Sequence, residues 1–244
     1  MFGELMALAK QFHIGVLTSG AFAPKEGLSG EQYLLEVLRA ESKLREERAT
    51  AERLRLAKLP TYKGFEEFDT DFQKGVTSSQ LETLSKLEWL DELFNLILIG
   101  PPGTGKTHVA IAIGNKAARQ GYKVAFQTMD TLIHILKTQE VSRKSQSRLG
   151  WIRKCDLLII DEMGYLPVSR GEANRFFALI SELYENASIV ITSNKGFDGW
   201  AELLGDAVLA TALLDRLTHR CQVLSFTDDS YRLAHREEIF TQEQ

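Results

Sequence analysis

Asn95-Leu96-Ile97-Leu98-Ile99-Gly100-Pro101-Pro102-Gly103-Thr104-Gly105-Lys106-Thr107 is the segment that indicates the fold class most clearly. Its first residues are almost all apolar, which predicts a buried strand, and a helical pattern over residues 108–120 follows. Between them stands the spacing G-x-x-x-x-G-K-T, which is typical of a loop that binds phosphate groups. Glycines let the backbone wrap closely enough for consecutive N–H groups to point at phosphate oxygens. A helix that begins at such a loop adds the positive end of its dipole to the same site.

Two side chains of this loop have predicted roles. Lys106 would reach the β- and γ-phosphates of a nucleotide, and Thr107 would hold Mg²⁺ through its hydroxyl. The alternative, a Gly/Pro turn with an accidental lysine, is disfavoured because strand, spacing and helix occur together. The predicted nucleotide-binding set is Gly100, Pro101, Pro102, Gly103, Thr104, Gly105, Lys106, Thr107 and His108.

Length and composition limit the number of domains and the classes of protein to which the chain can belong. The 244 residues are 44% hydrophobic and 25% charged, which allows one large domain or a domain with a smaller appendage. The net charge of −4 does not by itself indicate a nucleic-acid binder, although phosphate contact depends on local patches. Cys155 and Cys221 lack metal-ligand spacing and fit a reducing compartment. Since the sequence has neither a long apolar run nor a signal-peptide pattern, we expect a cytoplasmic protein without membrane contact.

Strand and helix patterns alternate after the first third of the chain. The apolar strand candidates are residues 95–99, 123–127, 157–160, 189–192 and 221–226. Continuous apolar strands separated by helices predict an α/β fold with a five-stranded parallel sheet covered on both faces.

The first 60 residues read as helices of a different character. A capping box at Ser29–Gln32 opens a helix that Pro60 ends. We therefore expect a small N-terminal helical domain over residues 1–60, which contacts DNA or a partner, and a second domain over residues 61–244. The mixed charges of residues 39–58 fit a solvated helix and a helix that touches DNA phosphates equally well.

Acidic and polar residues follow two of the predicted strands. Asp161 and Glu162 come after an apolar run, where Asp161 would hold Mg²⁺ and Glu162 would polarise an attacking water. The adjacent acids favour hydrolysis over kinase chemistry, because a water nucleophile needs a neighbouring base. Asn194 ends the next strand and would position that water, although an asparagine in a simple turn would look the same.

An arginine before the last predicted strand is a second kind of candidate. Arg216 could be supplied in trans to the γ-phosphate bound by a neighbouring subunit, as an arginine finger. The alternative is a surface salt bridge with Asp215, and spacing alone does not choose between them.

These motifs occur in the order found in AAA+ ATPases. Residues 100–107, 161–162, 192–194 and 215–216 resemble Walker A, Walker B, sensor 1 and the arginine-finger box. Finer details at residues 100–108, 161–165, 192–195 and 230–232 resemble the IstB family of transposition helper ATPases, over about residues 29–236. IstB is the partner of the IstA transposase and is related to the helicase loader DnaC and the initiator DnaA.

The resemblance implies a P-loop AAA+ core that uses ATP and Mg²⁺ to hydrolyse ATP. It implies catalytic roles for Lys106, Glu162, Asn194 and Arg216, with Arg220 as a reserve finger, and metal binding by Thr107 and Asp161. Residues 65–68 resemble the segment that covers the adenine edge. Because few residues follow Phe226, the helical lid of many AAA+ proteins is absent or reduced to residues 230–240, where Arg232 would substitute for sensor 2.

The family resemblance also implies partners. It implies an ATP-dependent oligomer that assembles on duplex target DNA, remodels it, recruits and stimulates an IstA-type transposase, and disassembles on hydrolysis. Residues 131–155 contain six lysines and arginines and one acidic residue, so this segment is locally basic in an acidic chain. We predict DNA-phosphate contacts there, although a basic face docked on acidic neighbours is the alternative. The predicted contacts are Lys137, Arg143, Lys144 and Arg148.

Three other functions compete with this interpretation. A DnaC-like helicase loader would grip single-stranded DNA, but residues 131–148 contain no aromatic residue for base stacking, which favours duplex DNA. A small-molecule kinase would need a mobile lid, for which the sequence offers no candidate. A nucleotide switch without turnover would not need Glu162.

Overall fold

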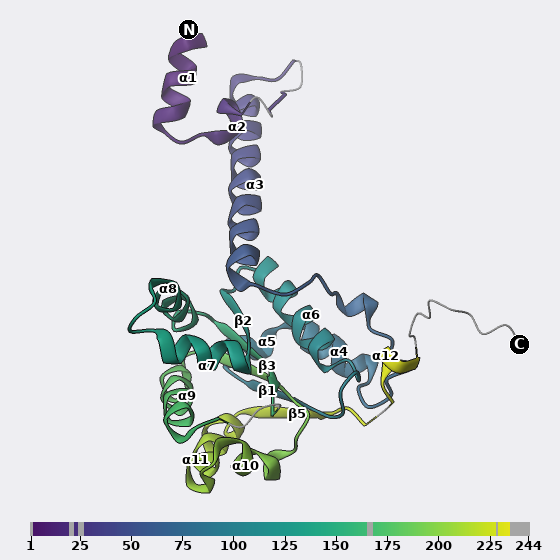
Figure 1. Cartoon of the computed structure of the whole chain (residues 1–244). Coiled ribbons are helices and arrows are strands. Elements are labelled where there is room, and N and C mark those ends of the chain that lie inside the picture. The colour runs from purple at the N-terminus through teal and green to yellow at the C-terminus, as the bar shows by residue number, and fades with distance from the viewer. Residues whose placement is uncertain (1, 20–21, 24–26, 165–167, 228, 235–244) are drawn as a thin grey trace, which may run out of the picture. The chain divides into compact units, whose positions relative to one another are not determined.

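The elements of the chain follow the predicted alternation. The computed structural model describes residues 2–19, 22–23, 27–164, 168–227 and 229–234 (Figure 1). The α-helices are α1 (Phe2–Gln11), α2 (Gly15–Thr18), α3 (Gly30–Ala57), α4 (Ser78–Lys86), α5 (Glu88–Asp91), α6 (Lys106–Arg119), α7 (Met129–Thr138), α8 (Arg143–Ile152), α9 (Arg170–Leu183), α10 (Trp200–Leu204), α11 (Ala207–Thr218) and α12 (Tyr231–Ala234), with short 3-10 turns η1 (Phe65–Glu67) and η2 (Phe197–Gly199). The strands are β1 (Asn95–Ile99), β2 (Val124–Thr128), β3 (Leu157–Met163), β4 (Ser188–Ser193) and β5 (Cys221–Ser225).

The strands form one sheet in the order β2-β3-β4-β1-β5, and every pairing between neighbours is parallel. This confirms the predicted five-stranded parallel sheet of an α/β P-loop ATPase. The carboxyl ends of the strands therefore meet at one edge of the sheet, and the amino ends meet at the opposite edge. The largest departure from the predicted strand ranges is in β3, which continues through Asp161 and Glu162 to Met163.

Both faces of the sheet are covered, because alternate side chains of each strand enter different apolar clusters. On β3, Leu158 and Ile160 pack with helices α7 to α11, whereas Leu157 and Ile159 pack with α4, α5 and α6 (Figure 1). Since strands buried on both faces have no polar side to alternate with, they appear in the sequence as unbroken apolar runs.

The chain divides into two compact units, residues 1–52 and 53–244. The division falls inside α3, before the boundary at residue 60 that we predicted from Pro60. The physical reason is that the last turn of α3 already bonds to the second unit. Arg53 Nε donates to Ala118 O at 2.9 Å, and the carbonyls of Leu56 and Ala57 accept from Arg148.

Local hydrogen bonds hold the first unit. The predicted capping box is present at the start of α3, where Gln32 N donates to Ser29 Oγ at 3.2 Å and Ser29 N donates to Gln32 Oε1 at 2.9 Å. Glu41 is buried and accepts from Val16 N at 2.9 Å and from Arg45 Nε at 2.7 Å, and these bonds lower the pKa of its carboxyl. In the described ranges no helix combines the length and the apolar character needed to cross a bilayer.

Candidate nucleotide-binding site

Residues 100–105 form the connection between β1 and α6 at the carboxyl edge of the sheet, and Lys106 and Thr107 begin α6, as the predicted phosphate loop requires. Gly103 and Gly105 adopt φ values of 83° and 96°, a left-handed conformation that glycine adopts without steric cost. A Cβ on Gly103 would collide with Ser230 Oγ, and one on Gly105 would come within 2.6 Å of the Phe68 ring. The loop is therefore packed on its outer side, and its curvature depends on glycine.

Lys106 is folded back onto its own loop. Its Nζ donates to Gly100 O at 2.7 Å and to Pro101 O at 2.6 Å, and the residue is only 8% exposed. Burial, together with the charge of Arg232, lowers the pKa of its ammonium to about 8, although the charge of Asp161 opposes the shift. A buried ammonium held only by neutral carbonyls is a site that an anion would stabilise.

Asp161 is the centre of a hydroxyl network between three elements. Its Oδ1 accepts from Thr107 Oγ1 at 2.8 Å and from Thr192 Oγ1 at 2.5 Å, and the residue is 5% exposed. Carboxylate and hydroxyl oxygens are ligands that Mg²⁺ accepts, so the pair Thr107 and Asp161 fits the predicted metal site. Thr192 has no separate role in the prediction from sequence. Its position two residues before Asn194 would have indicated it, because alternate residues of a strand share a face.

Glu162 stands in an irregular part of the sheet. The register between β3 and β4 shifts between Ile160 and Met163, and Glu162 has φ 64°. Its backbone N–H donates to Thr192 Oγ1 at 3.0 Å, and the residue is exposed. A left-handed conformation costs a non-glycine residue about 1–2 kcal/mol. Bulges beside active sites re-aim side chains, and at this one Asp161 is buried whereas Glu162 is exposed.

Asn194 supplies an unsatisfied polar atom next to these acids. Its Oδ1 is buried and has no hydrogen-bond partner among the described residues. It lies against Gly164, where an added Cβ would come within 2.7 Å of it. Because a buried carbonyl without a donor is costly, this atom fits a site that is completed by a bound water or ligand.

A cavity of about 420 Å³ opens beside the loop. It is lined by Pro60, Thr61, Lys63, Glu67, Phe68, Asp69, Gln73, Gly103, Gly105, Lys106, Thr107, His108, Ile111, Tyr231 and Arg232. This volume is within the range of small-molecule sites. Within the segment predicted to cover the adenine edge, Phe68 lines the cavity and its ring meets the His108 ring edge-on at 5.5 Å, whereas Phe65 packs against the core.

The end of the described chain closes one side of this cavity. Tyr231 N donates to Gly103 O at 3.1 Å, and the Tyr231 ring meets the Phe72 ring edge-on at 5.2 Å. The helix α12 and the cavity-lining Arg232 correspond to the described part of the predicted reduced lid, and residues 235–240 of that prediction lie outside the described residues.

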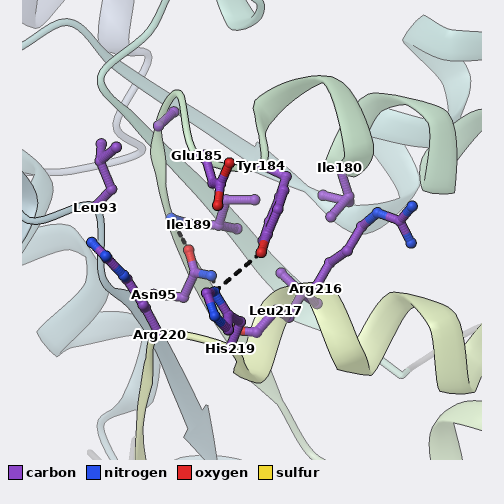
Figure 2. Close-up of a pocket in the computed structure, with 11 residues that line it drawn as sticks. Leu93, Asn95, Ile180, Tyr184, Glu185, Ile189, Arg216, Leu217, His219 and Arg220 are labelled. Carbon is purple, nitrogen blue, oxygen red and sulfur yellow. Dashed lines mark hydrogen bonds between the residues drawn. The ribbon is translucent and has the colours of Figure 1, made fainter.

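Arg216 and Arg220 lie at the other edge of the sheet, around a separate pocket of about 150 Å³ that Asn95 and Ile189 also line (Figure 2). The guanidinium of Arg216 stacks on the Phe177 ring with 4.5 Å to the ring centroid, and that of Arg220 donates to Glu92 O at 3.1 Å. Figure 2 shows the two guanidinium groups on opposite sides of the pocket. Neither arginine therefore joins the loop, Asp161 and Glu162 within one subunit.

The predicted DNA contacts on α7 and α8 have different environments. Lys137 pairs with Glu172 at 2.8 Å, and this bond, together with those from Ser169, lowers the pKa of the Glu172 carboxyl to about 2. Arg143 and Lys144 are exposed. Arg148 is 7% exposed and donates to the backbone carbonyls of Leu56, Ala57 and Phe126. A guanidinium in this position does not reach DNA phosphates, so the predicted DNA contact of Arg148 is wrong. The reason is that Arg148 is buried and its donors bond to backbone carbonyls.

Comparisons with known proteins agree with this geometry. A family model described as IstB-like ATP binding protein matches residues 15–239. An insertion sequence IS21 ATP-binding protein of Pseudomonas aeruginosa is 43% identical over 211 residues, which cover 86% of this chain and 80% of that protein. An insertion sequence IS5376 ATP-binding protein of Geobacillus stearothermophilus is 39% identical over 87% of this chain and 84% of that protein.

Solved structures share the fold at lower sequence identity. The AMPPCP-bound DnaA from Aquifex aeolicus is 22% identical with a TM-score of 0.57, over 72% of this chain and 53% of that one. A DnaI crystal structure is 19% identical with the same TM-score of 0.57, over 71% of this chain and 93% of that one. At these identities the likeness shows the P-loop ATPase fold.

Proposed function

The chain belongs to the family of IstB-like ATP-binding proteins, and from this membership we propose that it is an ATP-hydrolysing, DNA-binding helper of a transposase. The observation that carries the ATPase part is the convergence of Lys106, Thr107, Asp161 and Glu162 at one edge of the sheet, with the unsatisfied Asn194 Oδ1 beside them.

The residues of this edge divide the work of hydrolysis. Lys106 would leave the carbonyls of Gly100 and Pro101 and bind the β- and γ-phosphates, which replaces neutral partners with an anion. Thr107 and Asp161 would hold Mg²⁺, which neutralises the charge that develops on the phosphates. Glu162 would orient the attacking water, and Asn194 Oδ1 would accept a hydrogen bond from it.

The location of Arg216 supports assembly as part of this function. An arginine at the amino edge of the sheet cannot serve the site of its own subunit, but it can serve the site of a neighbour. We propose that ATP joins subunits through this contact and that the oligomer binds duplex target DNA, remodels it, and recruits and stimulates an IstA-type transposase. Hydrolysis would then disassemble the oligomer.

Fluorescence anisotropy tests this function with labelled duplex and single-stranded DNA of equal length. Each is titrated with the protein, Mg²⁺ and either ADP or a non-hydrolysable ATP analogue. The proposal predicts cooperative duplex binding that requires the ATP analogue. A clear preference for single strands would indicate a DnaC-like helicase loader, and binding to neither DNA would contradict the DNA-binding function.

A further inference from the structure

The buried Arg148 fastens helix α8 to the last turn of α3. Its Nη1 donates to Leu56 O, and its Nη2 donates to Ala57 O at 3.3 Å and to Phe126 O at 3.0 Å. The carbonyls at the end of a helix carry the negative end of its dipole, so Arg148 is placed where a cation caps α3. Burial lowers the pKa of this guanidinium to about 10, which leaves it charged at neutral pH.

Exposed cations surround this attachment. Arg55 and Lys58 come from the end of α3, and Lys144 lies one helical turn before Arg148 on α8. Burial lowers the pKa of the Lys58 ammonium, and the charges of Arg148, Lys144 and Arg55 lower it further. Arg55, Lys58 and Lys144 are all exposed, so three cations lie at the surface around the bonds from Arg148 to the end of α3.

We propose that Arg55, Lys58 and Lys144 form a single binding cluster for the phosphate backbone of DNA. The inference rests on the proposed function and extends its DNA contacts from α8 to the end of α3. Like charges held close together repel one another in the free protein, and a polyanion relieves that repulsion. Backbone phosphates are recognised by arginine and lysine charge without base contacts, which matches a cluster built from cations on two elements.

In the sequence, Lys58 of the cluster stands close to residues that line the nucleotide cavity. Pro60 and Thr61, which follow Lys58 after a single residue, line the cavity beside the loop. DNA bound at Lys58 would therefore contact the chain two residues before a wall of the nucleotide cavity. We expect duplex DNA to change the rate of ATP hydrolysis through this connection.

The experiment uses the double variant K58Q/K144Q, in which both lysines become neutral side chains of similar length. Lys58 has φ 56°, and glutamine carries the same Cβ in that conformation, so the backbone strain is unchanged. The matched control is K86Q, because Lys86 is also exposed and lies on α4 beside Glu82 at 3.7 Å. Each protein binds labelled duplex DNA with the non-hydrolysable ATP analogue at a series of salt concentrations.

The cluster predicts an apparent Kd for K58Q/K144Q at least about tenfold higher than that of the wild type. The slope of log affinity against log salt should fall by about 0.9 for each DNA phosphate that a subunit no longer neutralises. Stimulation of hydrolysis by duplex DNA should fall with it, while hydrolysis without DNA and the thermal midpoint stay unchanged. The K86Q protein should match the wild type in all five measurements.

Other outcomes separate this inference from the function on which it rests. If the wild type binds duplex DNA and K58Q/K144Q binds with the same affinity and salt slope, the cluster is overturned and the proposed function stands. If K58Q/K144Q keeps DNA binding but loses binding to the purified transposase, the cluster is a protein-binding surface, which also overturns the inference. If the wild type binds no DNA with the ATP analogue, both proposals fail.

Discussion

The two edges of the sheet are organised in opposite ways. At the carboxyl edge, Thr107, Asp161 and Thr192 are joined by hydrogen bonds. Lys106 precedes Thr107 in the chain, and Glu162 follows Asp161. At the amino edge, Arg216 rests on an aromatic ring and makes no contact with that network among the described residues. One subunit therefore holds a nearly complete site, and we infer that its remaining cation comes from a neighbour.

The largest expected effect comes from removing that cation. We predict that R216A lowers the ATPase rate of the assembled protein by roughly 1,000-fold, because arginine fingers contribute about 10³–10⁵ to such reactions. Nucleotide affinity of the dilute, unassembled protein should stay unchanged. R220A is the matched control at the same edge and should retain a rate within a few-fold of the wild type. The reverse pattern would assign the finger to Arg220.

Replacing the proposed water-orienting residue should have the next largest effect. E162Q should lower the ATPase rate by roughly 100-fold or more, since a positioned general base contributes about 10²–10⁴. ATP binding, measured by calorimetry, should persist because Lys106 and Asp161 remain. A variant with the wild-type rate would show that another group orients the water, and unimpaired biological function without turnover would favour the nucleotide switch.

Removing the hydroxyl that joins both acids tests the network itself. T192V should lower the ATPase rate by about 10- to 100-fold, which is typical when a partner that orients a metal ligand is lost. It also removes the acceptor of the Glu162 N–H, at a cost of about 1 kcal/mol in unfolding free energy. S193A is the control, because Ser193 is equally buried but bonds to Lys195 instead of Asp161. Equal rates for T192V and S193A would contradict a specific role for Thr192.

The smallest predicted effect is a pH dependence of nucleotide binding. Burial lowers the pKa of Lys106 to about 8 in the nucleotide-free protein, so the ammonium loses its proton as pH rises through 8. Affinity should be about tenfold weaker at pH 9 than at pH 7, because each pH unit above the pKa costs a factor of ten.

Protein stability should respond to the same group with the opposite sign. Between pH 8 and 10.5 the unfolded chain retains the Lys106 proton that the folded chain has released, so the lysine's contribution to stability rises with pH.

Calorimetric titrations with nucleotide at pH 7 and pH 9 measure the predicted change in affinity, and K106Q should lack this pH dependence. A wild-type affinity that is equal at pH 7 and pH 9 would contradict the role assigned to the Lys106 ammonium.

The sequence predicted the sheet well because β1 to β4 are mostly buried and appear in the sequence as clear apolar runs. It predicted the phosphate loop for a similar reason, since residues 100–107 have a backbone requirement that only glycines at fixed spacing meet. Thr192 escaped notice because a threonine in an apolar strand is ordinary. Its bond to Asp161 follows from the register that pairs Ile160 with Ile191, which the sequence alone does not reveal. Arg148 misled because charge in a sequence does not report burial, which depends on how α8 packs against α3.

Mixing subunits tests the division between the two edges without further assumptions about either. We predict that R216A and E162Q are each nearly inactive. R216A lacks the arginine at the amino edge, and E162Q lacks the carboxylate at the carboxyl edge. In a mixed assembly, the intact site of an R216A subunit can face the Arg216 of an E162Q neighbour. We expect equal amounts of the two variants to recover a substantial fraction of the wild-type ATPase rate. A mixture that assembles but remains as inactive as either variant alone would contradict the claim that the site is completed between subunits.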